Sequence, residues 1–289
     1  MKTRTKLVHG GTRRSQWGEV SEALFLTQGF VYETAEAAEA RFLSAGPDEF
    51  IYARYGNPTV AMFEERIAAL EGAEDAFATA SGMAAVSGAL TSLLRAGDHV
   101  VAARALFGSC LYVLEEVLTR FGVEVTFVDG TDLEQWRAAI RPDTRALFFE
   151  SVANPTLELV DIAAVAELAH AAGAVVVVDN VFATPVYSGA IAQGADVVVY
   201  SATKHIDGQG RCLGGVVIEH GTELLDTGRR QGADRAGGDR IHPDVLRPQV
   251  GGQVADTGLQ RGLCHTHHVV VRHHPLRAVV GEGEDRAAG

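Results

Sequence analysis

The sequence predicts an α/β fold built on a mainly parallel sheet that helices cover on both faces. Two observations predict it. Short runs of β-branched residues alternate with helical segments from about residue 76 onward, and the runs 175–178 and 197–200 are almost wholly valine. A strand that is apolar on both sides of its pleat is typical of a parallel sheet buried between crossover helices. The 289 residues, 47% of them hydrophobic, are enough to build such a core.

The expected elements follow in order along the chain. The first 50 residues are polar and predict an extended arm that carries a helix near 34–45. Asn57-Pro58-Thr59 opens the next helix, with Thr59 as the expected cap, and Glu71-Gly72 ends it. Strand–helix alternation predicts strands at 76–79, 99–102, 124–128, 146–150, 175–178 and 197–200, and helices at 84–94, 111–121, 133–140 and 162–172.

Composition narrows the class of partner and the compartment. The chain has 37 acidic and 25 basic residues, for a net charge of -12, which argues against nucleic-acid or anionic-membrane partners. Its three cysteines are widely spaced and form no CxxC pair, so neither a disulfide framework nor a cysteine zinc site is expected. The sequence shows no secretory signal pattern and no apolar run of about 18 residues. These features predict a cytoplasmic protein.

One lysine stands at the end of a predicted buried strand. The chain has only three lysines, and Lys204 closes the segment Ser201-Ala202-Thr203-Lys204 after the strand 197–200. Hydroxyl groups suit phosphate oxygens, and a partly desolvated lysine amine suits Schiff-base formation. Taken alone, such a lysine is more often an ordinary loop residue that forms a salt bridge.

Two further segments favour a cofactor. Asp179 ends the valine run 175–178, where a carboxylate costs desolvation unless it has a partner. Pyridoxal phosphate needs such a partner, because an acidic group keeps its pyridine nitrogen protonated. Ser81-Gly82-Met83-Ala84 precedes a helix and lets backbone N–H groups approach a phosphate. Each segment also has a simpler interpretation, a loop-capping aspartate and a serine-capped turn, but together with Lys204 they predict pyridoxal phosphate.

Five longer segments, in this order along the chain, carry a family resemblance: IYARYGNPT (51–59), ATASGMAA (78–85), SVANPT (151–156), VVDNVFATP (177–185) and SATKHIDGQGRCLGG (201–215). They resemble the Cys/Met-metabolism pyridoxal-phosphate enzymes, and the resemblance runs from about residue 8 to 218. It implies the large domain of a fold-type-I pyridoxal-phosphate enzyme, similar to aspartate aminotransferase, around a mainly parallel seven-stranded sheet.

The resemblance also implies roles for individual residues. Lys204 would form the Schiff base and act as acid and base on the substrate, and Asp179 would pair with the pyridine nitrogen. Asn154 would lie near the cofactor oxygen. Four further residues would hold the phosphate: Gly82, Met83, Ser201 and Thr203. No metal is implied.

The resemblance also implies a contribution to the site from a neighbouring subunit and a ring-stacking residue. The resemblance implies that Tyr52 and Arg54 reach the phosphate of a neighbouring subunit, so a homodimer or homotetramer is expected. Many relatives place a ring-stacking tyrosine where this chain has Leu111, with Tyr112 one position further along. The identity of the stacking residue therefore stays open between these two positions.

The implied activity is γ-replacement on an amino-acid substrate. Within the family the segments are most similar to enzymes that exchange succinate of succinyl-homoserine for sulfide and so make homocysteine for methionine biosynthesis. The alternatives are cysteine as the nucleophile, γ-elimination, or an inactive chain that lacks the family's C-terminal domain and its carboxylate-binding arginine.

The segments suggest an N-terminal arm over 1–50, a cofactor domain over 51–219 and an atypical, poorly ordered tail over 220–289. From residue 220 the charge is balanced, seven of the 11 histidines occur there, and no aromatic residue follows Tyr200. The histidine spacing matches no familiar metal pattern. Our hypothesis is a shifted reading frame or a deletion, with a naturally divergent C-terminus as the alternative; sequencing of the locus distinguishes them.

Overall fold

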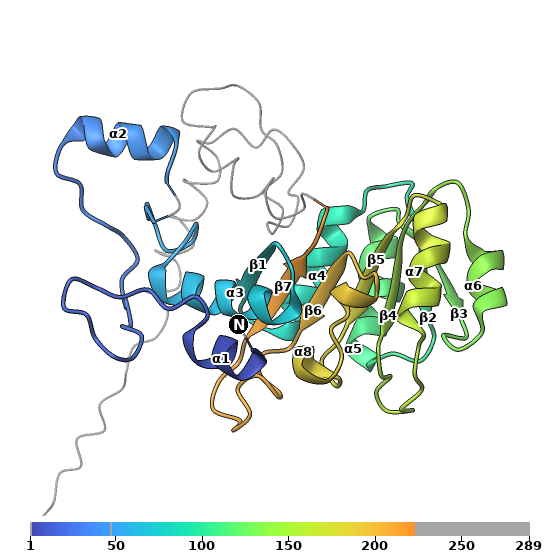
Figure 1. Cartoon of the computed structure of the whole chain (residues 1–289). Coiled ribbons are helices and arrows are strands. Elements are labelled where there is room, and N and C mark those ends of the chain that lie inside the picture. Colours follow the sequence, from blue (N-terminus) through green and yellow to red (C-terminus); the bar gives the residue numbers. More distant parts are fainter. Residues whose placement is uncertain (1, 47, 223–289) are drawn as a thin grey trace, which may run out of the picture. The chain divides into compact units, whose positions relative to one another are not determined.

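The sheet confirms the predicted α/β class. The computed structural model describes residues 2–46 and 48–222, so the predicted tail lies outside the described residues apart from 220–222. Seven strands form one sheet in the order β1-β7-β6-β5-β4-β2-β3 (Figure 1). All neighbouring strands are parallel except β7, which is antiparallel to both β1 and β6. The strands are β1 (Asp75–Thr79), β2 (His99–Ala103), β3 (Glu124–Val128), β4 (Thr144–Glu150), β5 (Val175–Asp179), β6 (Val197–Tyr200) and β7 (Gly215–Glu219).

The strand β7 is absent from the individual strands predicted above. It returns from β6 through the loop 201–214 and runs in the opposite direction. An antiparallel neighbour needs no crossover helix, so strand–helix alternation gives no signal for it. Its residues GVVIE are nevertheless fully buried, and they join β1 to the rest of the sheet.

Helices follow most of the predicted ranges, with one correction at the N-terminus. Residues Thr3–His9, expected to be extended, form the helix α1. It is held in place because the Lys6 Nζ donates to the carbonyl of Ala69 at 2.6 Å, near the end of α3.

No helix in the described part of the chain has the length and apolar character needed to cross a membrane. The remaining helical segments are α2 (Ala35–Leu43), α3 (Pro58–Glu71), α4 (Gly82–Leu93), α5 (Gly108–Tyr112), the π-helical η1 (Val113–Leu118), α6 (Leu133–Ala139), α7 (Ile162–Ala171), α8 (Thr184–Tyr187) and the 3-10 turn η2 (Ile191–Gln193).

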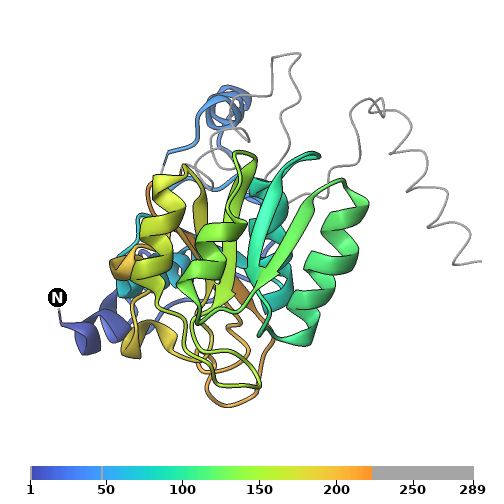
Figure 2. The ribbon, with the colours of Figure 1, turned by 90° about the vertical axis from the view of Figure 1, so that its right-hand side faces the viewer.

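Two helical layers bury the two faces of the sheet (Figure 2). Successive strand residues point to opposite faces, so Val176 and Val178 pack with α3, α6 and α7, whereas Val177 packs with α4, α5 and η1. This arrangement explains why β5 is apolar at every position before Asp179. It also fixes the direction of the polar residues that end the strands.

Asn57, and not Thr59, is the N-cap of α3. The Oδ1 of Asn57 accepts from the Thr59 N–H at 2.9 Å, and its Nδ2 donates to the Phe25 carbonyl at 2.9 Å. Proline fits the first helical position, which makes the residue before Pro58 the cap. Thr59 instead accepts from the Phe25 N–H through its hydroxyl at 2.8 Å, so both side chains fasten the N-terminal segment to α3.

We expect Asn57→Ala to lower the free energy of unfolding by about 2 kcal/mol, because it removes a helix cap and also the part-buried hydrogen bond from the Asn57 side chain to the Phe25 carbonyl. Thr34 is the matched control, since it caps the exposed helix α2 through one bond from Ala37. Thr34→Ala should cost about 1 kcal/mol or less. Urea unfolding of the two variants measures both values, and equal losses would contradict the assigned role of Asn57.

Candidate functional site

A cavity of about 250 Å³ lies where β4, β5 and β6 end. Ligands of open α/β sheets bind at this edge, beyond the carboxyl ends of the parallel strands. Seven of the nine predicted site residues line the cavity. They are Gly82, Met83, Asn154, Asp179, Ser201, Thr203 and Lys204.

The start of α4 forms one part of the cavity wall. Ser81 caps the helix, because its hydroxyl accepts from the Ala84 N–H at 3.2 Å. Gly82 follows, and a Cβ at this position would lie 2.6 Å from the Cβ of Ser201. Glycine therefore lets the helix start approach the end of β6. The first N–H groups of a helix have no intrahelical partner and carry a partial positive charge, so this part of the wall fits an anionic phosphate.

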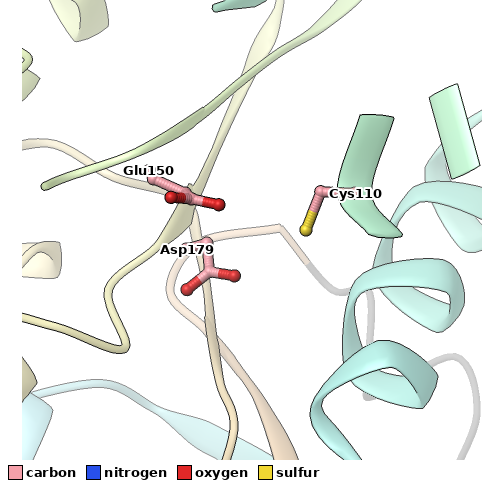
Figure 3. A group of neighbouring side chains, drawn as sticks. All are labelled: Cys110, Glu150 and Asp179. Atoms are coloured by element: carbon pink, nitrogen blue, oxygen red, sulfur yellow. The ribbon is translucent and has the colours of Figure 1, made fainter. Parts of the chain in front are cut away.

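A second part of the wall is acidic. Asp179 is paired with Glu150 in the parallel register of β5 and β4, and both point to the face covered by α5, where Cys110 lies (Figure 3). The ligand atoms of these three side chains lie within 4.8 Å of one another. They are close enough to approach one metal ion, but burial raises the pKa of the Cys110 thiol and so disfavours the thiolate that a metal needs.

Burial controls the protonation of Asp179. The pKa of this carboxyl is raised to about 7, chiefly by burial; the N–H of Val181 opposes the shift and the charge of the neighbouring Glu150 adds to it. That N–H donates to Asp179 Oδ1 at 3.1 Å. A carboxyl that titrates near neutrality beside a cavity is a physical signature of a functional site, and it fits a partner for a pyridine nitrogen.

Lys204 and Thr203 occupy the cavity in ways that differ from the prediction. The sequence predicts a partly desolvated amine, but Lys204 is exposed, since it follows the end of β6 and lies outside the covered sheet. The Thr203 hydroxyl donates to the carbonyl of Gly214 at 3.1 Å and accepts from the Gly214 N–H at 3.0 Å. Its hydrogen is thus engaged in closing the loop 201–214, which leaves Ser201 as the better placed hydroxyl donor for a phosphate.

Beneath the strand ends lies a buried hydrogen-bond chain that the sequence analysis missed. Ser151 donates to Asn180, Asn180 donates to the Tyr200 hydroxyl, and Tyr200 donates to Glu71 Oε2, each at 2.7 Å. The Oε1 of Glu71 accepts from the N–H of Ala190 at 2.6 Å. Three members directly adjoin Glu150, Asp179 and Ser201 in sequence, and this adjacency is the signal that could have identified them.

Three aromatic residues line the cavity, Phe107, Phe182 and Tyr200. Neither Leu111 nor Tyr112, the two positions considered from sequence, belongs to the lining. Tyr52 and Arg54 also lie outside it; the Arg54 guanidinium stacks on the ring of Tyr52 at 5.0 Å. Within one chain, the structure therefore does not bring these two residues to the other predicted site residues.

A comparison of the sequence with protein-family models identifies the family. The model of the Cys/Met metabolism PLP-dependent enzymes matches residues 4–245. The chain belongs to this family. The match reaches past residue 219, where the recognisable segments end, and the cofactor of the family is pyridoxal phosphate, which the phosphate-fitting helix start and the acidic wall accommodate.

Three proteins of the Cys/Met metabolism PLP-dependent family illustrate its range. The chain is 59% identical over 212 residues to an O-succinylhomoserine sulfhydrylase of Mycobacterium tuberculosis, covering 73% of this chain and 52% of that protein. It is 43% identical to an L-methionine gamma-lyase of Fusobacterium nucleatum, covering 77% and 56%. Among solved structures, an O-acetylhomoserine (thiol)-lyase of Campylobacter jejuni, which contains a pyridoxyl-lysine phosphate, matches with a TM-score of 0.73 at 32% identity, covering 78% and 56%. The chain thus spans about half the length of the curated relatives it matches.

The raised pKa of Asp179 makes the stability of this family member depend on pH. The native carboxyl keeps its proton up to about pH 7, whereas an unfolded aspartate loses it near pH 4, so Asp179 stabilises the fold at low pH and this contribution is lost as the pH rises through 7. We expect Asp179→Asn to reduce the decline in unfolding free energy between pH 4 and 7 by up to about 1.4 kcal/mol per pH unit. Urea unfolding without added cofactor measures both slopes; identical slopes would show that Asp179 is not the titrating group.

Proposed function

We propose that the chain carries the cofactor site of an enzyme that replaces the succinyloxy group on Cγ of O-succinylhomoserine with sulfide, giving homocysteine and succinate. The observation that carries this proposal is the 59% identity to the O-succinylhomoserine sulfhydrylase of M. tuberculosis, against 43% to the methionine gamma-lyase. The reaction belongs to methionine biosynthesis, and the substrate is a small amino-acid ester.

The lining residues divide between the two ends of the cofactor. The amides of Gly82 and Met83 and the hydroxyl of Ser201 bind the phosphate, with Thr203 shaping the same loop. Asp179 pairs with the pyridine nitrogen, and its pKa of about 7 allows its proton to pass to that nitrogen at neutral pH. Asn154 lies on the wall beside the cofactor oxygen, and Phe107 offers the ring with an aromatic surface.

Lys204 is the proposed catalytic residue. Pyridoxal phosphate, when bound, supplies an electron sink that stabilises negative charge on the carbon atoms of the substrate. Lys204 would hold the cofactor through its amine; once freed, the amine would take a proton from Cα of the substrate and move protons at Cβ while the Cγ–O bond breaks and succinate leaves. Its exposed position in the cavity wall gives the amine room to make this exchange.

We further propose that the active site is completed between subunits of a homodimer or homotetramer. Tyr52 is 39% exposed, and Arg54, stacked on its ring, lies outside the cavity of its own chain. The hydroxyl and the guanidinium are groups that bind phosphate well. In an assembly they would reach the phosphate in a neighbouring chain.

An assay of the purified full chain with pyridoxal phosphate and O-succinylhomoserine tests the activity. Sulfide as co-substrate should give homocysteine. Formation of cystathionine with cysteine instead would favour the cystathionine-forming alternative, and release of a keto acid from methionine would favour γ-elimination, which the gamma-lyase similarity supports. Cofactor binding without any turnover would mean that this chain keeps the cavity but lacks the activity.

Lys204→Ala should abolish the visible absorbance band of the cofactor bound to the lysine amine, because neither of the other lysines, Lys2 and Lys6, lines the cavity. Lys6→Ala is the control and should keep the band, although it removes the bond to Ala69. Absorbance scans after removal of free cofactor measure this. A band that persists in Lys204→Ala would place the covalent bond on another residue.

A further inference from the structure

The cavity contains a second buried carboxylate to which the proposed function gives no task. Glu150 ends β4, is only 4% exposed, and lines the cavity beside Asp179. A buried carboxylate costs several kcal/mol of desolvation unless donors stabilise it. Glu150 therefore needs partners, and the identity of these partners indicates its role.

Both oxygens of Glu150 accept hydrogen bonds from backbone N–H groups of two separate loops. Oε1 accepts from Phe107 at 2.6 Å, at the start of α5, and Oε2 accepts from Asn154 at 2.7 Å, in the loop after β4. Phe107 and Asn154 themselves line the cavity. The Glu150 side chain thus holds Phe107 and Asn154, which lie on two parts of the cavity wall, in fixed positions relative to each other.

The same carboxylate acts on Asp179 through its charge. The register of β4 and β5 pairs Glu150 with Asp179, and their oxygens lie within 4.8 Å. The other titratable groups around Asp179 are Cys110 on α5, Tyr200 on β6, whose hydroxyl bonds Asn180 and Glu71, and Lys204, which lines the same cavity. Burial raises the pKa of Glu150, but the bonds from Phe107 and Asn154 oppose that shift and favour its ionised form. Of these groups, Glu150 is the acidic one held in register with Asp179 on an adjacent strand.

We propose that Glu150 is a positioning residue of the cofactor cavity, which holds the Phe107 and Asn154 walls and places a second negative charge beside Asp179. The cofactor part of this inference rests on the proposed function, but the effect on Asp179 does not. Two like charges in a poorly solvated site favour the protonated form of one of them. Asp179 then carries a proton near neutral pH that a pyridine nitrogen can receive.

The first experiment follows the titration of Asp179 by carbon NMR of aspartate-labelled full chain without cofactor, with Asp179→Asn to assign the signal. Glu150→Gln removes the charge, so the Asp179 midpoint should fall by about one pH unit or more. Glu150→Asp keeps the charge and should leave the midpoint close to that of the parent chain. An unchanged midpoint in Glu150→Gln overturns the proposal, whether or not the chain is an active sulfhydrylase.

The second experiment measures the dissociation constant of pyridoxal phosphate by titration. Glu150→Asp is too short to reach both N–H groups, and Glu150→Gln has only one acceptor for them, so each should weaken binding about tenfold or more. The control is Glu219→Gln. Glu219 is equally buried at 4% exposure but pairs with the first residue of β6, at the opposite end of the strands. Equal weakening of cofactor binding in the control and in the Glu150 variants overturns the proposal that Glu150 positions the cavity wall.

Discussion

The pairing of Glu150 with Asp179 across β4 and β5 is the constraint on which the cavity depends. Side chains alternate along a strand, so a register that pairs these two residues places both carboxyl groups on the same face. A shift by one residue would pair Ser151 with Asp179. The Glu150 carboxyl group would then point toward the opposite helical layer from Asp179. The parallel sheet, buried by helices on both sides, fixes this register through its valine-rich strands, because a slip would misplace every core side chain.

The same alternation separates two polar groups at the strand ends. Glu150 and Asp179 face α4 and α5, whereas Ser151, Asn180 and Tyr200 form the hydrogen-bond chain to Glu71 near the opposite layer. Every link of that chain has a donor and an acceptor, and Glu71 accepts the last hydrogen bond. Burial raises the pKa of Glu71, and the bonds from Tyr200 and the backbone oppose that shift. A fully paired network under the site restrains the backbone that carries the cavity residues.

The sequence predicts the sheet, its covered faces and seven residues of the cavity because those features depend on local pattern and on strand ends. It does not predict β7, since an antiparallel return leaves no helix to signal it, nor α1, whose contacts with α3 are distant in sequence. Phe107 and the role of Glu150 were missed for a related reason. Their importance comes from a bond between the end of β4 and the start of α5, 43 residues apart, which periodicity does not report. Tyr52 and Arg54 lie outside the cavity of the chain, so their role at a neighbouring subunit stays a proposal.

The electrostatics of the cavity favour one orientation of its ligand. The start of α4 offers backbone N–H groups and a positive dipole end, whereas Glu150 and Asp179 place two neighbouring carboxyl groups at the strand ends. A molecule with an anionic group and a protonatable nitrogen gains from both features in one orientation and is repelled by both when reversed. Pyridoxal phosphate has this polarity. In the proposed function the acidic wall would serve recognition as well as chemistry, which gives a reason for keeping Glu150 buried at a cost in desolvation.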